Sequence, residues 1–143
     1  MAKSRDPSEL KEAWENWHNE VGRPIRPLYK QYVKLGNEAA VKNGFKTLDD
    51  LWSFPWETPN FKEQIENLWK EIEVIYKKVH AYIRMKLRRK YGNDLFKDGT
   101  IPAHLLGNMW AQTWNNIMDI AIPFPNKSSI DVTDELVKQV QCF

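Results

Sequence analysis

The sequence predicts an all-α protein of five to six helices, one of them long, at about residues 61–90. Three observations carry this prediction. Apolar residues recur at spacings of three and four along most of the chain, and no segment alternates as a half-buried strand does. Pro, Gly and Asn divide the chain into segments of helical length. Hydrophobic residues at 42% and charged residues at 28% indicate a folded globular chain rather than a disordered one.

The first helix is expected to follow Asp6 and to run to about position 21. Asp6 can cap it, Pro7 has the fixed φ that suits the first helical position, and Glu9 can reach back to the cap. Gly22 is expected to end this helix.

The next segments are bounded by turn-forming residues. The prolines at positions 24 and 27 restart the chain, and a second helix is expected at about 27–42, ended by the left-handed cap Asn43-Gly44. Residues 47–50 open a short third helix, and the Pro-rich stretch 54–59 interrupts the helical pattern.

The longest helix is expected to begin at the capping-box sequence of residues 60–63. If it stays helical to Lys90, it is roughly 45 Å long, a length that normally crosses a large domain. Its apolar residues form one continuous seam, close to the period of a coiled coil: Phe61, Ile65, Leu68, Ile72, Ile75, Val79 and Tyr82.

Beyond a loop bounded by Gly92 and Gly99, a helix is expected at 101–122, stopped by Pro123, and a last one begins near 131–134. The segment 101–122 is apolar on most sides, so it requires partners on most sides. Five or six helices do not supply them, and we therefore expect large exposed apolar patches. Residues 1–143 are interpreted as a single region, a partial chain of a larger, mostly helical domain.

Composition excludes several classes of function. A net charge of +2 is too small to favour nucleic acid or an acidic membrane. No apolar run approaches the roughly 20 residues of a membrane span, and the first residues do not form a secretory signal. The single Cys142 cannot form an internal disulfide. Taken literally, these features indicate a cytoplasmic protein, and the oligomeric state stays open.

Two groups of residues, the basic run and the histidines, are candidates for binding sites. The basic run at residues 84–90 suits a nucleic-acid binder, but it also suits the end of a helix, where cations meet the negative end of the dipole. The second interpretation is favoured, so no nucleic acid is expected. The three histidines, His18, His80 and His104, are not spaced as helical zinc ligands, and no metal site is expected in this chain.

Four stretches carry a resemblance to a known family: residues 101–114 with Pro123-Phe124-Pro125, residues 4–17, residues 35–44 and residues 80–84. Over about residues 1–139 the chain resembles the angiotensin-converting-enzyme family of zinc dipeptidyl carboxypeptidases (peptidyl-dipeptidases). The resemblance implies a helical metallopeptidase domain in which two His and a Glu hold zinc and a second Glu activates a water. It also implies a secreted or membrane-anchored protein, hydrolysis that releases C-terminal dipeptides, and chloride binding.

The sequence contains no His-Glu-x-x-His motif, so it lacks the zinc segment of that family. Two functional hypotheses follow. The first is an N-terminal part of a catalytic domain, inactive alone, which supplies a wall of the substrate cleft. The second is a stand-alone, non-catalytic helical module that binds a peptide or a protein.

The resemblance assigns roles to four residues, and a short sequence pattern adds a fifth candidate. Gln112 and Thr113 occupy positions at which the family binds the C-terminal carboxylate of a peptide, although the Lys and Tyr that complete the clamp are not in this sequence. His18 and Trp56 replace a chloride-binding Arg and Tyr of the mammalian enzymes, which weakens the case for chloride. Asn126, in Asn126-Lys127-Ser128, fits the glycosylation pattern.

Overall fold

The computed structural model describes residues 1–127 and 132–140. Its elements are all helical: α1 (Pro7–Trp17), a π turn (His18–Gly22), α2 (Arg23–Lys42), α3 (Leu48–Ser53), α4 (Phe61–Tyr91), α5 (Met118–Ala121) and α6 (Thr133–Val140). Three short 3₁₀ turns occur at Phe54–Trp56, Ala103–Leu105 and Asn115–Ile117. No strand occurs in the described ranges, and the predicted all-α class is confirmed.

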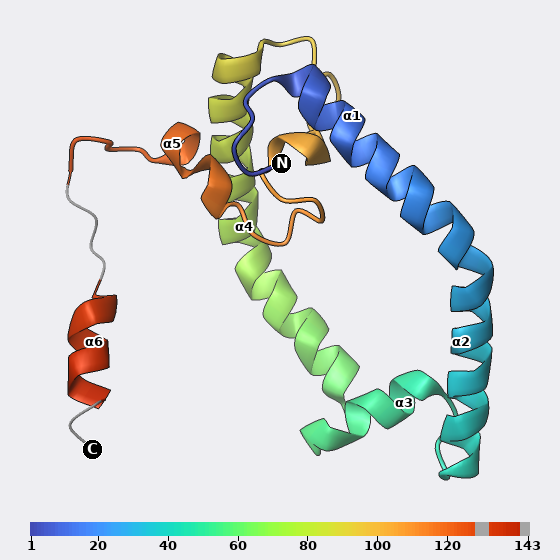
Figure 1. Ribbon diagram of the computed structural model, residues 1–143. Helices are drawn as coiled ribbons and strands as arrows, with labels where there is room; N and C mark the ends of the chain where they lie inside the picture. The colour runs from blue at the N-terminus through green and yellow to red at the C-terminus, as the bar shows by residue number, and fades with distance from the viewer. Residues whose placement is uncertain (128–131, 141–143) are drawn as a thin grey trace.

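The helices are arranged as an open ring (Figure 1). α1 and α2 form one long arm, α3 crosses at its far end, and α4 returns as the second arm. The irregular segment between α4 and α5 lies at the other end of the ring, where the start of α1 meets the end of α4. The long helix predicted at 61–90 is confirmed almost to the residue.

The hydrophobic core is small and lies at the end of the ring where α1 begins. It joins one residue of α1, two of α4 and four of the segment that follows: Leu10, Ile83, Leu87, Phe96, Leu105, Leu106 and Ile117. Arg5 ties the N-terminus to the same place, because its guanidinium donates to the Asn116 carbonyl at 2.8 Å and to the Asp119 carboxylate at 2.9 Å.

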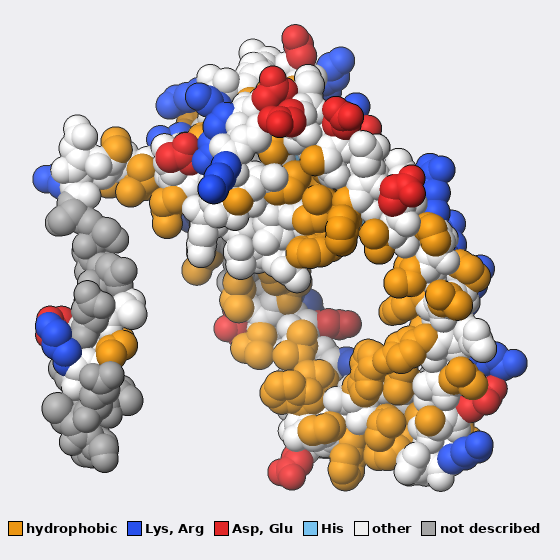
Figure 2. Space-filling view, in the orientation of Figure 1, with side chains coloured by type: hydrophobic (Ala, Val, Ile, Leu, Met, Phe, Trp, Pro, Cys, Tyr) orange, Lys and Arg blue, Asp and Glu red, His pale blue; other side chains and the backbone are white. Residues whose placement is uncertain are grey.

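The rest of the ring leaves its apolar faces uncovered. Figure 2 shows hydrophobic side chains gathered around the central opening, along α2, α3 and α4. The predicted α4 seam is part of this surface, and five of its residues are about half exposed or more: Ile65, Leu68, Ile72, Ile75 and Val79. The expectation of large exposed apolar patches is confirmed for the part of the chain that the structure describes.

Two of the predicted helix caps are confirmed, and two other details of the predicted helix ends are wrong. Asp6 caps α1 as predicted, but the cap's own N–H donates to the Ser4 hydroxyl, which in turn binds Glu9. Asn60 makes no side-chain cap, so the predicted capping box of α4 is wrong. The Asn43-Gly44 cap is confirmed: Gly44 has φ +84° and the Phe45 N–H donates to the Ala40 carbonyl at 3.0 Å.

The predicted stop at Gly22 is wrong, because a π turn carries the chain from α1 directly into α2. Pro24 lacks the N–H that a regular α-helix requires at this point. A π turn bonds i to i+5 and is wider, so it accommodates the proline without ending the helical path.

The predicted helix at 101–122 is also wrong. Gly107 and Ala111 have positive φ values of 74° and 53°, which a right-handed helix does not contain. Instead, the Asn108 side chain accepts the Trp110 N–H at 2.9 Å, and the Asn116 amide donates to the Gly107 carbonyl at 2.8 Å. These side chain–backbone bonds replace helical ones, a competition typical of Asn.

Candidate functional site

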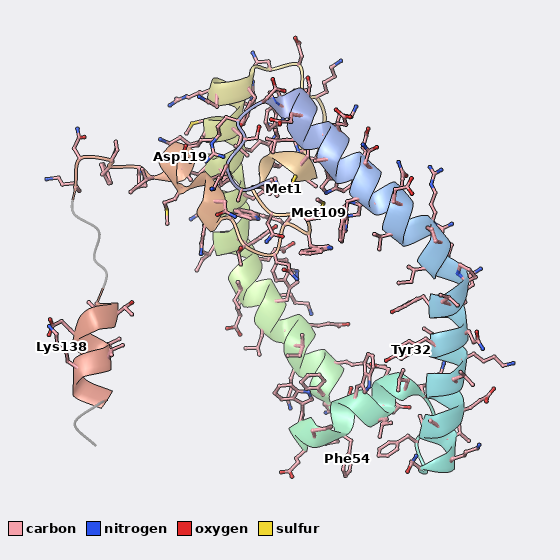
Figure 3. The ribbon with its side chains drawn as sticks, in the orientation of Figure 1. Met1, Tyr32, Phe54, Met109, Asp119 and Lys138 are labelled. Carbon is pink, nitrogen blue, oxygen red and sulfur yellow. The ribbon has the colours of Figure 1, made fainter. Side chains whose placement is uncertain are left out.

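The candidate site lies where the irregular segment 106–114 meets the end of α1. The Trp17 and Trp110 rings contact edge to face, with centroids 6.1 Å apart at 82°. Both are accessible, with Trp17 44% and Trp110 60% exposed. Met109, which precedes Trp110, is on the side of this segment that faces α1 (Figure 3). The contact places exposed aromatic surface at the end of the ring that contains the core.

Gln112 and Thr113 follow directly in the same turn. Both are exposed, and among the described residues neither side chain has a hydrogen-bond partner. The backbone around them is held in place: the Trp114 indole donates to the Ala111 carbonyl at 3.2 Å, and the Ala111 N–H donates to the Asn108 carbonyl at 3.2 Å. The turn thus presents a free amide and a free hydroxyl on a fixed backbone.

The two candidate chloride ligands lie far apart. His18 begins the π turn, where its ring packs on Trp14 with centroids 4.0 Å apart and its Nδ1 lies 2.7 Å from the Trp14 carbonyl oxygen. Trp56 follows α3 at the opposite end of the ring, stacked on Phe61 with centroids 5.3 Å apart. The structure does not bring them together, and chloride binding at either residue stays a prediction.

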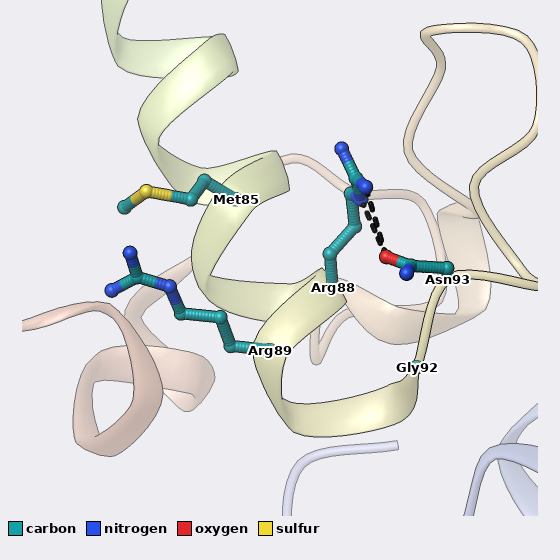
Figure 4. A pocket seen from close by; sticks show the side chains of 5 residues that line it. All are labelled: Met85, Arg88, Arg89, Gly92 and Asn93. Carbon is teal, nitrogen blue, oxygen red and sulfur yellow. Dashed lines mark hydrogen bonds between the residues drawn. The ribbon is translucent and has the colours of Figure 1, made fainter.

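The basic run at the end of α4 holds loops in place. Arg84 donates to the carbonyls of Thr100 at 3.1 Å and Phe96 at 2.6 Å, and Lys86 donates to the Ile122 carbonyl at 3.3 Å. In the shallow pocket at the helix end, Arg88 donates to the Asn93 side-chain oxygen, while Arg89 points to the other side with Met85 (Figure 4). Three of the run's cations therefore stabilise the loops after α4.

The sequence predicts an ordinary structural role for His104, but the structure gives this side chain an unusual environment. Its Nε2 atom is buried and has no hydrogen-bond partner in the described structure. Burial lowers the pKa of His104, and the nearby Lys11 lowers it further, while Glu15 acts in the opposite direction. A buried ring nitrogen without a partner disfavours the charged imidazolium.

We expect the free energy of unfolding to fall on acidification because of His104. The folded state has the lower pKa, so below the unfolded value of about 6.5 the unfolded chain binds more protons. The destabilisation caused by His104 is therefore absent above that pH. It grows as the pH falls below the unfolded value and through the lower, folded-state pKa. Urea unfolding between pH 8 and pH 5 should show a smaller slope for His104→Gln than for the wild type. His18→Gln is the matched control, and equal slopes for all three proteins would contradict this account.

The resemblance implies zinc, which requires several ligating side chains gathered at one place. No group of three or more His, Cys, Asp or Glu side chains gathers in residues 1–127 and 132–140, so no step of chemistry is assigned to a metal here. None of the described helices is long and apolar enough to cross a membrane. Cys142 and Ser128 lie outside the described residues.

Comparison with known proteins places this chain in a peptidase family. The family model described as angiotensin-converting enzyme (Peptidase M2) matches residues 1–141. The chain therefore belongs to the angiotensin-converting enzyme family.

Individual relatives agree. The chain is 48% identical over 134 residues to the angiotensin-converting enzyme-like protein Ace3 of Mus musculus, covering 93% of this chain and 18% of that protein. It is 46% identical over 140 residues to the angiotensin-converting enzymes of Sus scrofa and Theromyzon tessulatum, covering 97% of this chain and 11% and 23% of theirs. The chain thus spans less than a quarter of the length of these relatives.

Proposed function

We propose that this chain is part of a peptidase domain that removes dipeptides from the C-termini of peptides. Family membership over nearly the whole chain carries the proposal. In that domain, the segment 106–114 and the end of α1 form a wall of the substrate cleft. The zinc ligands belong to a segment other than these 143 residues, and the chain alone is inactive.

Gln112 is proposed to bind the C-terminal carboxylate of the peptide, with Thr113 beside it. An amide NH₂ donates to a carboxylate without adding a competing charge, and a hydroxyl can donate as well. Both groups are exposed and without partners among the described residues, which supports the assignment. The neighbouring Trp17–Trp110 pair offers apolar surface for the side chain of the same peptide residue.

The exposed apolar ring favours this proposal over a stand-alone binding module. A monomer rarely exposes contiguous apolar patches of more than a few hundred Å², and here the opening is lined by apolar side chains from three helices. Circular dichroism and light scattering of the purified chain separate the two ideas. Self-association that increases with protein concentration is expected, because the apolar ring is uncovered, whereas a helical monomer at every concentration that is indifferent to zinc would favour the module.

A chimaera tests the peptidase proposal. The chain replaces its matching segment in the Theromyzon tessulatum enzyme, and kcat/KM is measured for one peptide with a free C-terminus and for its C-terminal amide. Loss of a hydrogen bond to a charged group costs about 1.5–3 kcal/mol, so Gln112→Ala should lower kcat/KM for the free acid by about 10- to 100-fold. The amide should be affected less.

Gln31→Ala, an exposed glutamine on α2, is the matched control and should leave both rates unchanged. An unchanged acid-to-amide ratio in Gln112→Ala would refute the role of Gln112. A folded chimaera without any activity would refute the wider proposal.

Glycosylation at Asn126 is proposed with a secretory location. Asn126 is exposed in the turn that follows Pro123 and Pro125, where the Lys127 N–H donates to the Phe124 carbonyl at 3.0 Å. An exposed turn is accessible to the modifying enzyme, which supports the assignment.

A further inference from the structure

One face of α2 carries a row of four cations. Arg23, Arg26, Lys30 and Lys34 follow one another at spacings of three and four residues, which places them on one side of the helix. All four are exposed, and they extend over roughly 17 Å of helix axis. Figure 2 shows basic side chains along the outer edge of this arm, away from the apolar opening. We call these residues the α2 basic stripe.

The charges of the stripe are largely unpaired. Only Lys34 has an acidic partner, Glu38, at the long distance of 4.0 Å. Arg23, Arg26 and Lys30 form no ion pair in the described structure, although Glu20 lies three residues before Arg23. The two acids of α3 are engaged elsewhere, since Asp49 pairs with Lys62 and the Asp50 carboxylate accepts the backbone N–H of Thr47.

Among the described residues, Arg23, Arg26 and Lys30 lack the ion pair that one lysine of α1 and one lysine of α4 form. Lys11 pairs with Glu15 in α1, and Lys77 pairs with Glu73 in α4, each at the i, i+4 spacing that stabilises a helix. The stripe instead places three like-charge pairs in succession. Each such pair destabilises an isolated helix by about 0.2–0.5 kcal/mol. An anionic partner would remove this repulsion.

We propose that the α2 basic stripe binds a stiff, linear polyanion, namely a sulfated polysaccharide. A straight row of cations matches a ligand whose anionic groups also follow a line. Each guanidinium can pair with two oxygens of one oxyanion, and each ammonium acts as a point charge. The inference is independent of the proposed peptidase function.

Other polyanions fit the stripe less well. A single-stranded nucleic acid requires aromatic side chains on which bases stack, but the tyrosines of α2 lie off this face, and Tyr32 is on the side of the opening (Figure 3). An extended acidic peptide turns alternate side chains away from the surface. It also loses roughly 1–2 kcal/mol of backbone entropy per ordered residue, a cost that a stiff chain largely avoids.

Heparin, in solution at about 0.15 M salt, is the probe for the full chain and its variants. Arg26→Glu with Lys30→Glu should raise the Kd by about tenfold or more and reduce its salt dependence. The control, Lys46→Glu with Lys97→Glu, makes the same change in net charge at exposed loop positions and should alter the Kd less than about twofold. Arg26→Gln with Lys30→Gln should weaken binding in the same direction without adding acids.

Circular dichroism measures the helix content of each variant. The helix content should not fall, because the substitutions reduce the repulsion between like charges on α2. Equal weakening in the control pair would show that net charge alone binds heparin, and would overturn the proposal. Equal or tighter binding of poly-glutamate or single-stranded DNA would overturn the choice of polysaccharide.

Discussion

Leu87→Ala is expected to be among the most destabilising substitutions in this chain, with a loss of about 2–5 kcal/mol in the free energy of unfolding. Leu87 is completely buried at the centre of the small core, where α4 meets the segment that follows it. Truncation removes buried apolar contacts and leaves a cavity. The described core has only seven buried members, so the neighbours that could fill this cavity are few. Urea unfolding followed by circular dichroism measures the effect.

Leu68→Ala is the matched control, because the same side chain on the same helix is 52% exposed there. Its loss should be below about 1 kcal/mol, as for a surface site. Equal losses in the free energy of unfolding would mean that the α4 seam is covered in solution. This result would contradict the exposure of Leu68 in the structure.

Gly107→Ala is expected to cost about 2–4 kcal/mol, from two separate causes. Its φ of +74° is unfavourable for any residue with a Cβ. In addition, the new Cβ would lie 2.8 Å from the Asn116 Cβ and 3.3 Å from the Ile117 Cγ2, inside normal contact distance. The Asn116–Gly107 hydrogen bond, which holds the turn with Gln112, should be lost with it.

Gly99→Ala separates the two causes. Gly99 has a similar φ of +84°, but a Cβ there would meet nothing within 4 Å. Its cost should therefore be that of backbone strain alone, about 1–2 kcal/mol. Equal losses at both positions would show that the close approach at Gly107 contributes nothing.

At the candidate site, the sequence predicts which residues are involved but not the conformation of their backbone. Gln112 and Thr113 are predicted from the sequence through a family resemblance, but the helix predicted for their backbone is wrong. The error has a visible source, because Gly107-Asn108 and Asn115-Asn116 are turn-forming pairs inside an apolar pattern. At these pairs the turn preference of Gly and Asn overrides the helical spacing of the apolar residues.

Other features could not be predicted from local patterns at all. The contact between Trp17 and Trp110 joins residues 93 positions apart, and the Arg5–Asp119 ion pair joins residues 114 positions apart. Such contacts depend on how the N-terminus and α1 pack against the segment that follows α4. The buried Nε2 of His104 depends on the same packing, since α1 packs over the turn that contains it.

The sequence by itself determined the all-α class, the long helix α4, the caps at Asp6 and Asn43-Gly44, and the family. These properties depend on apolar periodicity and on side chains within a few residues of one another, which a linear pattern records. Only the tertiary structure decided that α1 and α2 continue through Gly22, that residues 101–117 are not a helix, and where the small core lies. Those outcomes depend on packing and hydrogen bonds between distant residues, whose free energies override local preference.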